Sequence, residues 1–382
     1  MASAKPRRKA LHEKPAEQEH YDKTVLLLQG GGALGAYQAG AYETLAEGGY
    51  APDWVAGISI GAINAAIIVG NPPEERAAKL RAFWQRITRT FNWPAPDGDL
   101  PRRLFNTLNS LGVMTFGLPS FFRPRIPSPL LRPRGANGST SFYDTSPLLD
   151  TLEELVDFER INHGDLRLTL GAVDVEKGNF ECFDNTKRRI GPEHVLASGS
   201  LPPGFPPTEV DGRLYWDGGL TSNTQLSYVL KAMPVLNHVL IFQVDLWDAR
   251  GAAPRNLFEV EARRKDIVYS SRTRLNTEFF QREFQLREAI AKLTERLPEE
   301  ALNDSELTEY IDLGHWRSVS LVHLIYKEKR NETHARDYEF SRASMIDHWR
   351  AGRADAGHAL TNPKWLPPRT DHKAGIRIFD MS

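Results

Sequence analysis

Apolar and polar positions follow two different periods along the first part of the chain. Residues 24–28 form a continuous apolar run, typical of a strand buried on both faces of a parallel sheet. Residues 33–47 have the spacing of a helix, 53–58 that of a second short strand, and 59–69 that of a helix built from small residues. This β-α-β-α order predicts an α/β fold.

The pattern continues with strands that need not all be parallel. Residues 166–175 and 180–183 read as adjacent strands, and 238–246 is another strongly apolar strand. We therefore expect three α/β/α layers around a mixed, mainly parallel sheet. Residues 318–327 resemble a final strand, and 337–350 a further helix.

A long charged helix is expected after residue 250. Residues 256–297 carry apolar positions at intervals of three, four, seven and eight, which places them on one broad helical face. We expect this face to pack on its own domain rather than on a partner subunit or a membrane. Its members are Ile267, Leu275, Phe279, Leu286, Ile290, Leu293 and Leu297.

These patterns divide the chain into three parts. Residues 1–22 lack apolar periodicity and predict a flexible tail, with a basic membrane-touching patch at its start as the alternative. Residues 23–248 would form the main domain, and 249–382 a mainly helical C-terminal extension. Residues 93–141 are rich in Pro, Gly and Arg, so we expect an insertion without regular elements and with exposed aromatic side chains, Phe116, Phe121 and Phe122. A lid over an acyl-binding groove is the alternative to an ordinary long loop there.

Composition narrows the class of protein. The 382 residues are 41% hydrophobic and 25% charged, as in a globular protein, and the formal net charge of -1 gives no reason to expect a nucleic-acid partner. A single cysteine, Cys182, excludes an intramolecular disulfide and, in a strand-like setting, reads as structural. Without a signal-like or membrane-spanning run, we expect a cytoplasmic protein whose membrane contact, if any, is peripheral.

A serine stands where the second predicted strand meets its helix. In Gly57-Ile58-Ser59-Ile60-Gly61, the flanking glycines permit the sharp turn that lifts a hydroxyl clear of the backbone. The helix N-terminus also favours negative charge developing on oxygen. Ser59 is therefore a candidate nucleophile for acyl transfer.

A glycine-rich loop follows the first predicted strand. Gly30, Gly31, Gly32, Ala33 and Gly35 open the first helix, so that several backbone amides can converge on one small anionic locus, as in an oxyanion hole. The same letters fit a dinucleotide-binding pattern. That pattern requires an acidic residue at the end of the second strand, where this chain has its serine turn, and this disfavours NAD or FAD.

A carboxylate is presented at a turn further along the chain. Asp217-Gly218-Gly219 closes the strand-like residues 213–216, but on its own it is an ordinary turn signal. The competing arrangement is a serine-acid-histidine triad, for which histidines lie downstream without any recognisable catalytic loop around them. These are His315, His323, His334 and His348. No cluster of His, Cys and carboxylates has the spacing of metal ligands.

Four motifs stand in an order that resembles the patatin-like phospholipase family, over roughly residues 24–245. They are the glycine loop, the serine turn, the run Ala197-Ser-Gly-Ser-Leu-Pro-Pro-Gly-Phe-Pro-Pro207 and the Asp-Gly-Gly turn. The resemblance implies a lipid acyl hydrolase with Ser59 as nucleophile, Asp217 as base, and an oxyanion hole of Gly30, Gly31, Gly32 and Ala33. It implies no metal and no cofactor. Where members of the family often have Lys or Arg in the glycine loop, this chain has Leu34, so no preference for an anionic head group follows from that position.

The resemblance leaves the substrate and partners open. Phospholipids or lysophospholipids are the expected lipid esters, and short-chain or hydroxyalkanoate esters are the alternative. A non-catalytic scaffold is a third hypothesis. The C-terminal extension, around 326–330 and 337–342, resembles one found in bacterial patatin-like proteins, some of which are linked with 3-hydroxybutyrate dehydrogenases. Such a dehydrogenase is the protein partner that the resemblance implies.

Overall fold

A nine-stranded sheet runs through the part of the chain that the computed structural model describes, which is residues 21–88, 95–233, 238–314, 318–327, 331–362, 364–365 and 375–381. The strand order is β11-β10-β9-β1-β2-β5-β8-β7, and β6 also pairs with β5. The parallel strands are β1 (Lys23–Leu28), β2 (Trp54–Ile58), β5 (Arg167–Asp174), β9 (His238–Asp245), β10 (Ser318–Ile325) and β11 (Gly375–Asp380). The predicted mixed, mainly parallel sheet is confirmed.

The antiparallel strands lie at one side of β5. Both β6 (Phe180–Asp184) and β8 (Arg213–Asp217) run antiparallel to β5, and β7 (Thr208–Val210) runs antiparallel to β8. The expected pairing of residues 166–175 with 180–183 is present as β5 and β6. This side of the sheet carries the carboxylate discussed below.

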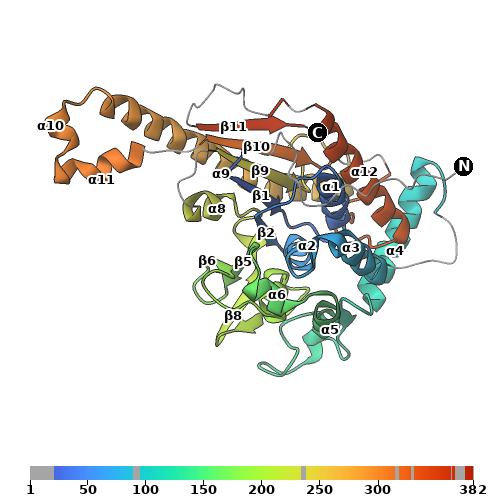
Figure 1. Cartoon of the computed structure of the whole chain (residues 1–382). Coiled ribbons are helices and arrows are strands. Elements are labelled where there is room, and N and C mark those ends of the chain that lie inside the picture. Colours follow the sequence, from blue (N-terminus) through green and yellow to red (C-terminus); the bar gives the residue numbers. More distant parts are fainter. Residues whose placement is uncertain are drawn as a thin grey trace, which may run out of the picture.

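Helices cover both faces of the sheet (Figure 1). Leu26 and Leu28 of β1 share a core with α1 (Gly35–Glu47), α2 (Ile60–Val69), α3 (Pro73–Ile87) and α12 (Arg342–Thr361). Val25 and Leu27 point to the other face, where α8 (Leu226–Ala232) and α9 (Leu257–Thr294) cover them. The strand is apolar throughout because both of its faces are buried.

The C-terminal extension is built into the same domain. Its strands β10 and β11 continue the central sheet, and α12 packs along α1. Glycines permit this close crossing, since a Cβ at Gly352 would lie 1.9 Å from the Tyr37 carbonyl oxygen and a Cβ at Gly40 would lie 2.1 Å from that of Trp349. Residues 249–382 are mainly helical, as predicted, and they share their hydrophobic core with the first 248 residues.

The expected packing of α9 is wrong for much of its apolar face. Among the α9 side chains that the structure describes, Phe284 is buried against the sheet, whereas several members of the predicted face are exposed: Ile267, Phe279, Leu286, Leu293 and Leu297. The side chain of Leu275 lies outside the described residues. Past Phe284, the end of α9 extends away from the sheet as an arm, together with α10 (Glu299–Leu302) and α11 (Ser305–Gly314) (Figure 1).

The insertion also differs from its prediction. It contains an 18-residue helix, α4 (Asp99–Phe116), followed by the short strands β3 (Arg123–Pro124) and β4 (Tyr143–Asp144). Pro101 falls in the first turn of α4, where a missing N–H costs no helical hydrogen bond. Phe116 is exposed as expected, but Phe121 and Phe122 are buried against Phe205.

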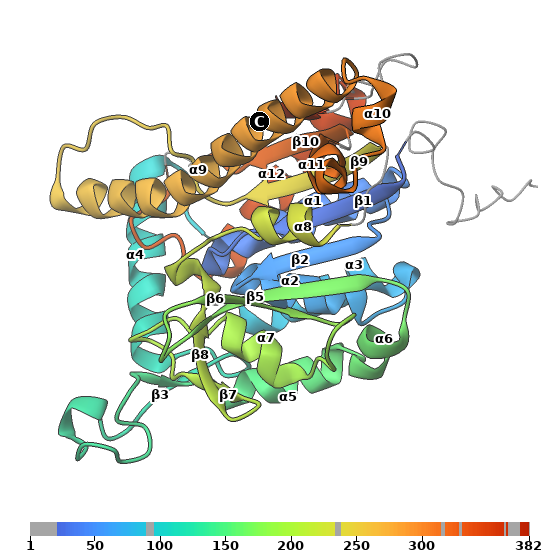
Figure 2. The same ribbon diagram turned by 90° about the vertical axis from the view of Figure 1, so that its left-hand side faces the viewer.

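Three short helices lie below β5 in Figure 2: α5 (Ser146–Leu155), α6 (Phe158–His163) and α7 (Pro192–Ser198). The same view shows the carboxyl end of β2 pointing toward the side along which α4 runs. Among the helices of the described residues, none combines the length and the apolar character needed to cross a bilayer. The predicted tail falls almost wholly outside the described residues, at positions 1–20.

Candidate active site

Ser59 occupies a strained turn between β2 and α2. Its φ of 56° lies in the left-handed region, which is unusual for a residue with a side chain and is the signature of a nucleophile elbow. The flanking glycines make the turn sterically possible: a Cβ at Gly57 would lie 2.2 Å from the Gly61 carbonyl oxygen, and one at Gly61 would lie 2.3 Å from that of Leu28. Only glycine fits at these two positions.

A buried serine holds the elbow in place. The Ser59 amide donates to Ser198 Oγ at 3.1 Å, and Ser198 Oγ donates to the Gly171 carbonyl at 2.6 Å. Ser198 belongs to the Ala197–Pro207 run, which only the family resemblance marked as part of the site. It fixes the backbone from which the Ser59 hydroxyl projects.

The sheet brings Asp217 to the same place as Ser59. On β5, Gly171 pairs with Ile58 of β2, and the next residue, Ala172, pairs with Asp217 of β8. A strand has two edges, and β6 occupies the other one over residues 169–173. The end of β2 and the end of β8 therefore meet at a single edge of β5, with Ser59 directly after one and Asp217 terminating the other.

The Asp217 carboxyl is buried and hydrogen-bonded. Its Oδ1 accepts from the Gly219 amide at 2.7 Å, and the Ser59 side chain lies close enough to stabilise its charged form. Burial raises its pKa to about 6, although the Ser59 side chain and the Gly219 amide favour the charged form. The turn is tight, since a Cβ at Gly218 would lie 2.6 Å from the Gly171 carbonyl oxygen. The arrangement is that of a hydroxyl beside a carboxylate of unusually high proton affinity.

The glycine loop lies against the elbow, and a Cβ at Gly30 would lie 3.1 Å from Ser59 Cβ. Two of the four predicted oxyanion donors are already engaged: the Gly30 amide donates to Asn223 Oδ1 and the Ala33 amide to the Asp337 carbonyl. Within the described residues, the amides of Gly31 and Gly32 have no acceptor, and both line the cavity described below. The amides of Gly31 and Gly32 are therefore the remaining candidate oxyanion donors.

Asn223 is a site residue that sequence reasoning missed. Its side chain forms two hydrogen bonds of 3.1 Å with the backbone N–H and C=O of Gly30, as a neighbouring strand would. Trp247 adds a third contact, because its Nε1 donates to the same carbonyl at 2.9 Å. The position of an asparagine six residues after Asp217, in the turn that follows it, is the only signal of this role in the sequence.

The C-terminal extension supplies the other support of the loop. Gly32, with φ of 55°, lies so close to the turn before α12 that a Cβ there would be 2.0 Å from the Asp337 carbonyl oxygen. Lys265 of α9 holds this turn, donating to Asp337 Oδ1 at 2.6 Å and to the His334 carbonyl at 3.1 Å. Residues 337–342 carried the resemblance of the extension, but nothing in the sequence indicated that they support the glycine loop.

A cavity of about 440 Å³ opens beside Ser59 and Asp217. Its volume is in the usual range for small-ligand sites. Its walls are mainly apolar and come from α4, from the segment after α4, from the Ala197–Pro207 run and from the turn before α12. They include Val113, Met114, Phe121, Phe122, Leu148, Leu201, Phe205 and Phe340. Among the described residues that line the cavity there is no Lys, Arg or His, so Asp217 and Asp337 are its charged groups.

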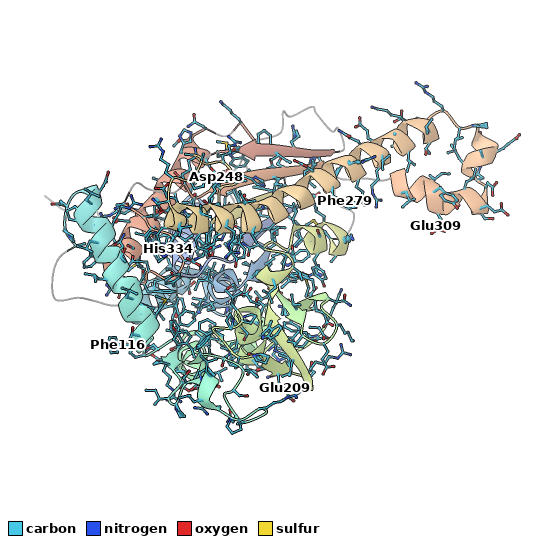
Figure 3. The ribbon with its side chains drawn as sticks, turned by 180° about the vertical axis from the view of Figure 1, so that it is seen from behind. Phe116, Glu209, Asp248, Phe279, Glu309 and His334 are labelled. Atoms are coloured by element: carbon cyan, nitrogen blue, oxygen red, sulfur yellow. The ribbon has the colours of Figure 1, made fainter. Side chains whose placement is uncertain are left out.

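The three candidate triad histidines that the structure describes do not line this cavity. His323 is on β10, and His334 stacks on Phe258 of α9, with ring centroids 4.7 Å apart. His348 Nε2 lies 2.8 Å from Glu332 Oε1, and its Nδ1 lies 3.3 Å from the Ala33 carbonyl, behind the glycine loop. His315 is outside the described residues. Figure 3 places His334 beside the first turns of α9.

Two further predictions concern Cys182 and metal ions. Cys182 lies half-buried in β6, where burial and the neighbouring Asp184 raise the pKa of its thiol, so the reactive thiolate is disfavoured. Across the residues that the structure describes, no three His, Cys, Asp or Glu side chains gather in a way that could hold a metal ion.

Comparison with protein families gives two matches. A family model described as patatin-like phospholipase matches residues 26–230, more than half of the chain, and one described as patatin phospholipase matches residues 267–372. A search of curated proteins found no match. Among solved structures, the crystal structure of VipD from Legionella pneumophila is similar with a TM-score of 0.35 and 14% sequence identity, over 89% of this chain and 67% of that chain.

Proposed function

The chain belongs to the patatin-like phospholipase family, and we propose that it hydrolyses the carboxylic esters of phospholipids or lysophospholipids with Ser59 and Asp217 as a two-residue catalytic unit. The family supports a lipid acyl hydrolase in general. The observation that carries the finer proposal is the position of the Ser59 side chain beside the buried Asp217 carboxyl, at the wall of a mainly apolar cavity.

The reaction would proceed through an acyl enzyme. As Ser59 Oγ attacks the ester carbonyl carbon, the Asp217 carboxylate takes the hydroxyl proton, and the carbonyl oxygen becomes an oxyanion. The amides of Gly31 and Gly32 would donate to that oxyanion, each contributing roughly 3 kcal/mol. The tetrahedral intermediate collapses when the C–O bond to the leaving alcohol breaks, and Asp217 returns the proton to that alcohol. Water then attacks the acyl enzyme by the same route and releases the fatty acid.

The raised pKa of Asp217 suits this role. A general base works best when its pKa lies near the working pH, and an ordinary aspartate is too weak a base for an alcohol. With a pKa of about 6, Asp217 is ionised at pH 8 and yet holds a proton more tightly than an exposed aspartate does. We expect kcat/KM for a monomeric ester to rise with pH through an apparent pKa of about 6 and then level off. A profile without a step between pH 5 and 7 would contradict Asp217 as the base.

The cavity favours the acyl chain as the recognised part of the substrate. Its apolar walls can bury methylene groups, each worth about 0.8 kcal/mol, and it offers no cation for a phosphate. A phospholipid head group would therefore stay at the mouth. We expect kcat/KM for p-nitrophenyl esters to rise at least about tenfold from butyrate to octanoate, by that methylene contribution. A preference for butyrate would favour the short-chain carboxylesterase alternative.

The direct test is a fluorophosphonate probe on the full chain, followed by peptide mapping. Labelling of Ser59 with release of fatty acid from phosphatidylcholine or lysophosphatidylcholine is the expected result, and Ser59→Ala should abolish both. Heat-denatured protein serves as the control for non-specific labelling. A folded protein that neither reacts with the probe nor cleaves any of these esters would favour the non-catalytic scaffold.

A further inference from the structure

The outer face of α4 is apolar and lies open. Leu100, Leu104, Leu108 and Leu111 are 78%, 62%, 58% and 50% exposed. Their spacing of four, four and three residues puts them in one line along the helix. We call this line the α4 leucine stripe.

The inner face of the same helix is polar. Arg102 pairs with Asp347 at 3.0 Å, the Asn106 side-chain amide donates to the Asn331 carbonyl at 3.1 Å, and Asn109 donates to Glu339. A surface helix ordinarily buries its apolar side and exposes its polar side. In α4 this arrangement is reversed. Because each leucine left in water forgoes roughly 1.5–3 kcal/mol of burial, the stripe is the part of the helix that a second surface should cover.

The stripe is continuous with the mouth of the cavity. Val113 and Met114, in the next turn of α4, line the cavity, and Met114 is itself partly exposed. Phe116 ends the helix, at its lower end in Figure 3. A second exposed apolar group, Ile126, Leu130 and Leu131, lies in the segment after β3. Figure 2 shows that segment and α4 along the same side of the molecule.

The charge of this region indicates what covers it. Residues 99–142 contain six arginines and a single acidic residue, Asp99. Arg102 and Arg123 pair with carboxylates of the protein. Within the described part of the chain, the other four have no carboxylate partner: Arg103 and Arg134 are exposed, and Arg125 and Arg132 donate to uncharged oxygen atoms nearby. Leucines next to arginines match a surface of acyl chains beneath anionic head groups. A second copy of the chain fits less well, since a twofold contact would oppose the same positive segments.

We infer that the α4 leucine stripe, together with the tip at residues 126–131, docks on a lipid surface that carries anionic head groups and holds the cavity mouth against it. The inference rests on the proposed function for the nature of the substrate. The docking contact itself needs no chemistry at Ser59. In this arrangement an acyl chain passes from the lipid surface into the cavity beside Val113 and Met114, while the arginines remain at the level of the phosphates.

Docking can be tested by sedimentation with vesicles, using the full chain with Ser59→Ala so that no lipid is consumed. We expect binding to vesicles of phosphatidylglycerol and phosphatidylcholine, weaker binding to phosphatidylcholine alone, and a loss of binding in 0.5 M NaCl. The double variant Leu104→Glu/Leu108→Glu should weaken vesicle binding at least about tenfold, since it places two charges in the apolar contact.

Matched variants separate docking from folding and from catalysis. Leu286→Glu/Leu293→Glu makes the same change on the exposed face of the α9 arm and should leave vesicle binding as it was. With Ser59 restored, Leu104→Glu/Leu108→Glu should hydrolyse a soluble monomeric ester within about twofold of the parent, because neither leucine lines the cavity. If the parent protein binds vesicles but hydrolyses no ester, the proposed function is contradicted and the docking inference still holds.

Three results would overturn the inference. One is an active enzyme that does not sediment with anionic vesicles. Another is a Leu104→Glu/Leu108→Glu variant that binds them as tightly as the parent. The third is a dimer of the parent in analytical ultracentrifugation that this variant converts to a monomer, which would assign the stripe to a second copy of the chain.

Discussion

The two sides of the glycine loop are built in different ways. On one side, Ser59 and Asp217 each end a strand, and pairing with β5 brings them together. On the other side, the turn at Asp337 reaches the loop from more than 300 residues away in sequence and is held by Lys265 of α9. The first side places the two groups that we propose react, and the second places the backbone that faces them. Changes to the first should abolish the reaction, whereas changes to the second should weaken it.

The largest effect is expected for Asp217→Asn. Asparagine keeps the size and can accept the Gly219 hydrogen bond, but it cannot take the Ser59 proton, so kcat should fall by at least about 10⁴, since loss of the catalytic base of a serine hydrolase costs about 10⁶. Steady-state hydrolysis of p-nitrophenyl octanoate measures this. His334→Ala is the matched control and should keep activity within a few-fold. A histidine variant as inactive as Asp217→Asn would replace the two-residue unit with a triad.

A change where the two sides meet comes next. Gly32→Ala would place a Cβ 2.0 Å from the Asp337 carbonyl oxygen, so the loop or the turn must move and the Gly32 amide leaves its position. Loss of one oxyanion donor lowers kcat by about 10² to 10³. Gly178→Ala is the control, because Gly178 also has a positive φ, of 68°, but a Cβ there meets nothing within 4 Å. Equal activity in the two variants would show that the Asp337 contact does not hold the loop.

The difference between the two sides also decides what could be predicted from sequence. The strand β1, the elbow at Ser59 and the turn at Asp217 are signalled by neighbouring residues, since a buried run followed by glycine is a local pattern. Their meeting was predicted through the resemblance, and its physical cause is the pairing register on β5. The C-terminal extension supports the glycine loop through contacts between residues far apart in the sequence, such as Asp337 with Ala33. A single sequence carries no signal of such contacts.

The two long helices show a second limit. The apolar period correctly located α9, but it does not indicate which of the apolar residues pack against the rest of the domain. Leu286 and Leu293 were expected to be buried, and they are exposed. In α4 the proline and glycine content concealed an 18-residue helix whose leucines do have helical spacing. Composition outweighed periodicity there, although Pro101 is harmless in a first turn. An apolar period predicts a helix face, and tertiary contacts decide whether that face is covered.

A third test compares the two sides in stability rather than activity. The pKa of Asp217 is about 6 in the folded protein against an ordinary value of 3.8, so folding favours its protonated form. Its contribution to stability is therefore full below pH 3.8 and is lost as the pH rises through 6, which amounts to roughly 3 kcal/mol by pH 8. Asp217→Asn should thus raise the free energy of unfolding by about 2–3 kcal/mol at pH 8 and much less at pH 4. Urea denaturation at both values measures this.

Asp337→Asn is the contrasting variant on the other side of the loop. It weakens the ion pair with Lys265 and should bring no gain in stability at pH 8. A stability gain in both variants would mean that the removal of any acidic residue is enough, and a gain in neither would mean that the Asp217 carboxyl is not strained by its burial.

The smallest effect is expected for Lys265→Met, which keeps most of the side-chain length and removes the charge that holds Asp337. The pair is largely buried, with side chains 14% and 22% exposed, so its loss lets the turn and the Gly32 amide drift without removing a reacting group. We expect kcat to fall about tenfold, equivalent to about 1.4 kcal/mol, with KM unchanged, because a displaced oxyanion donor acts in the transition state alone. Lys292→Met removes a solvent-exposed pair with Glu288 on the same helix and should leave kcat as it was. A rise in KM without a change in kcat would instead mean that the turn at Asp337 contacts the bound substrate. It would also mean that the C-terminal extension does not position the oxyanion donors.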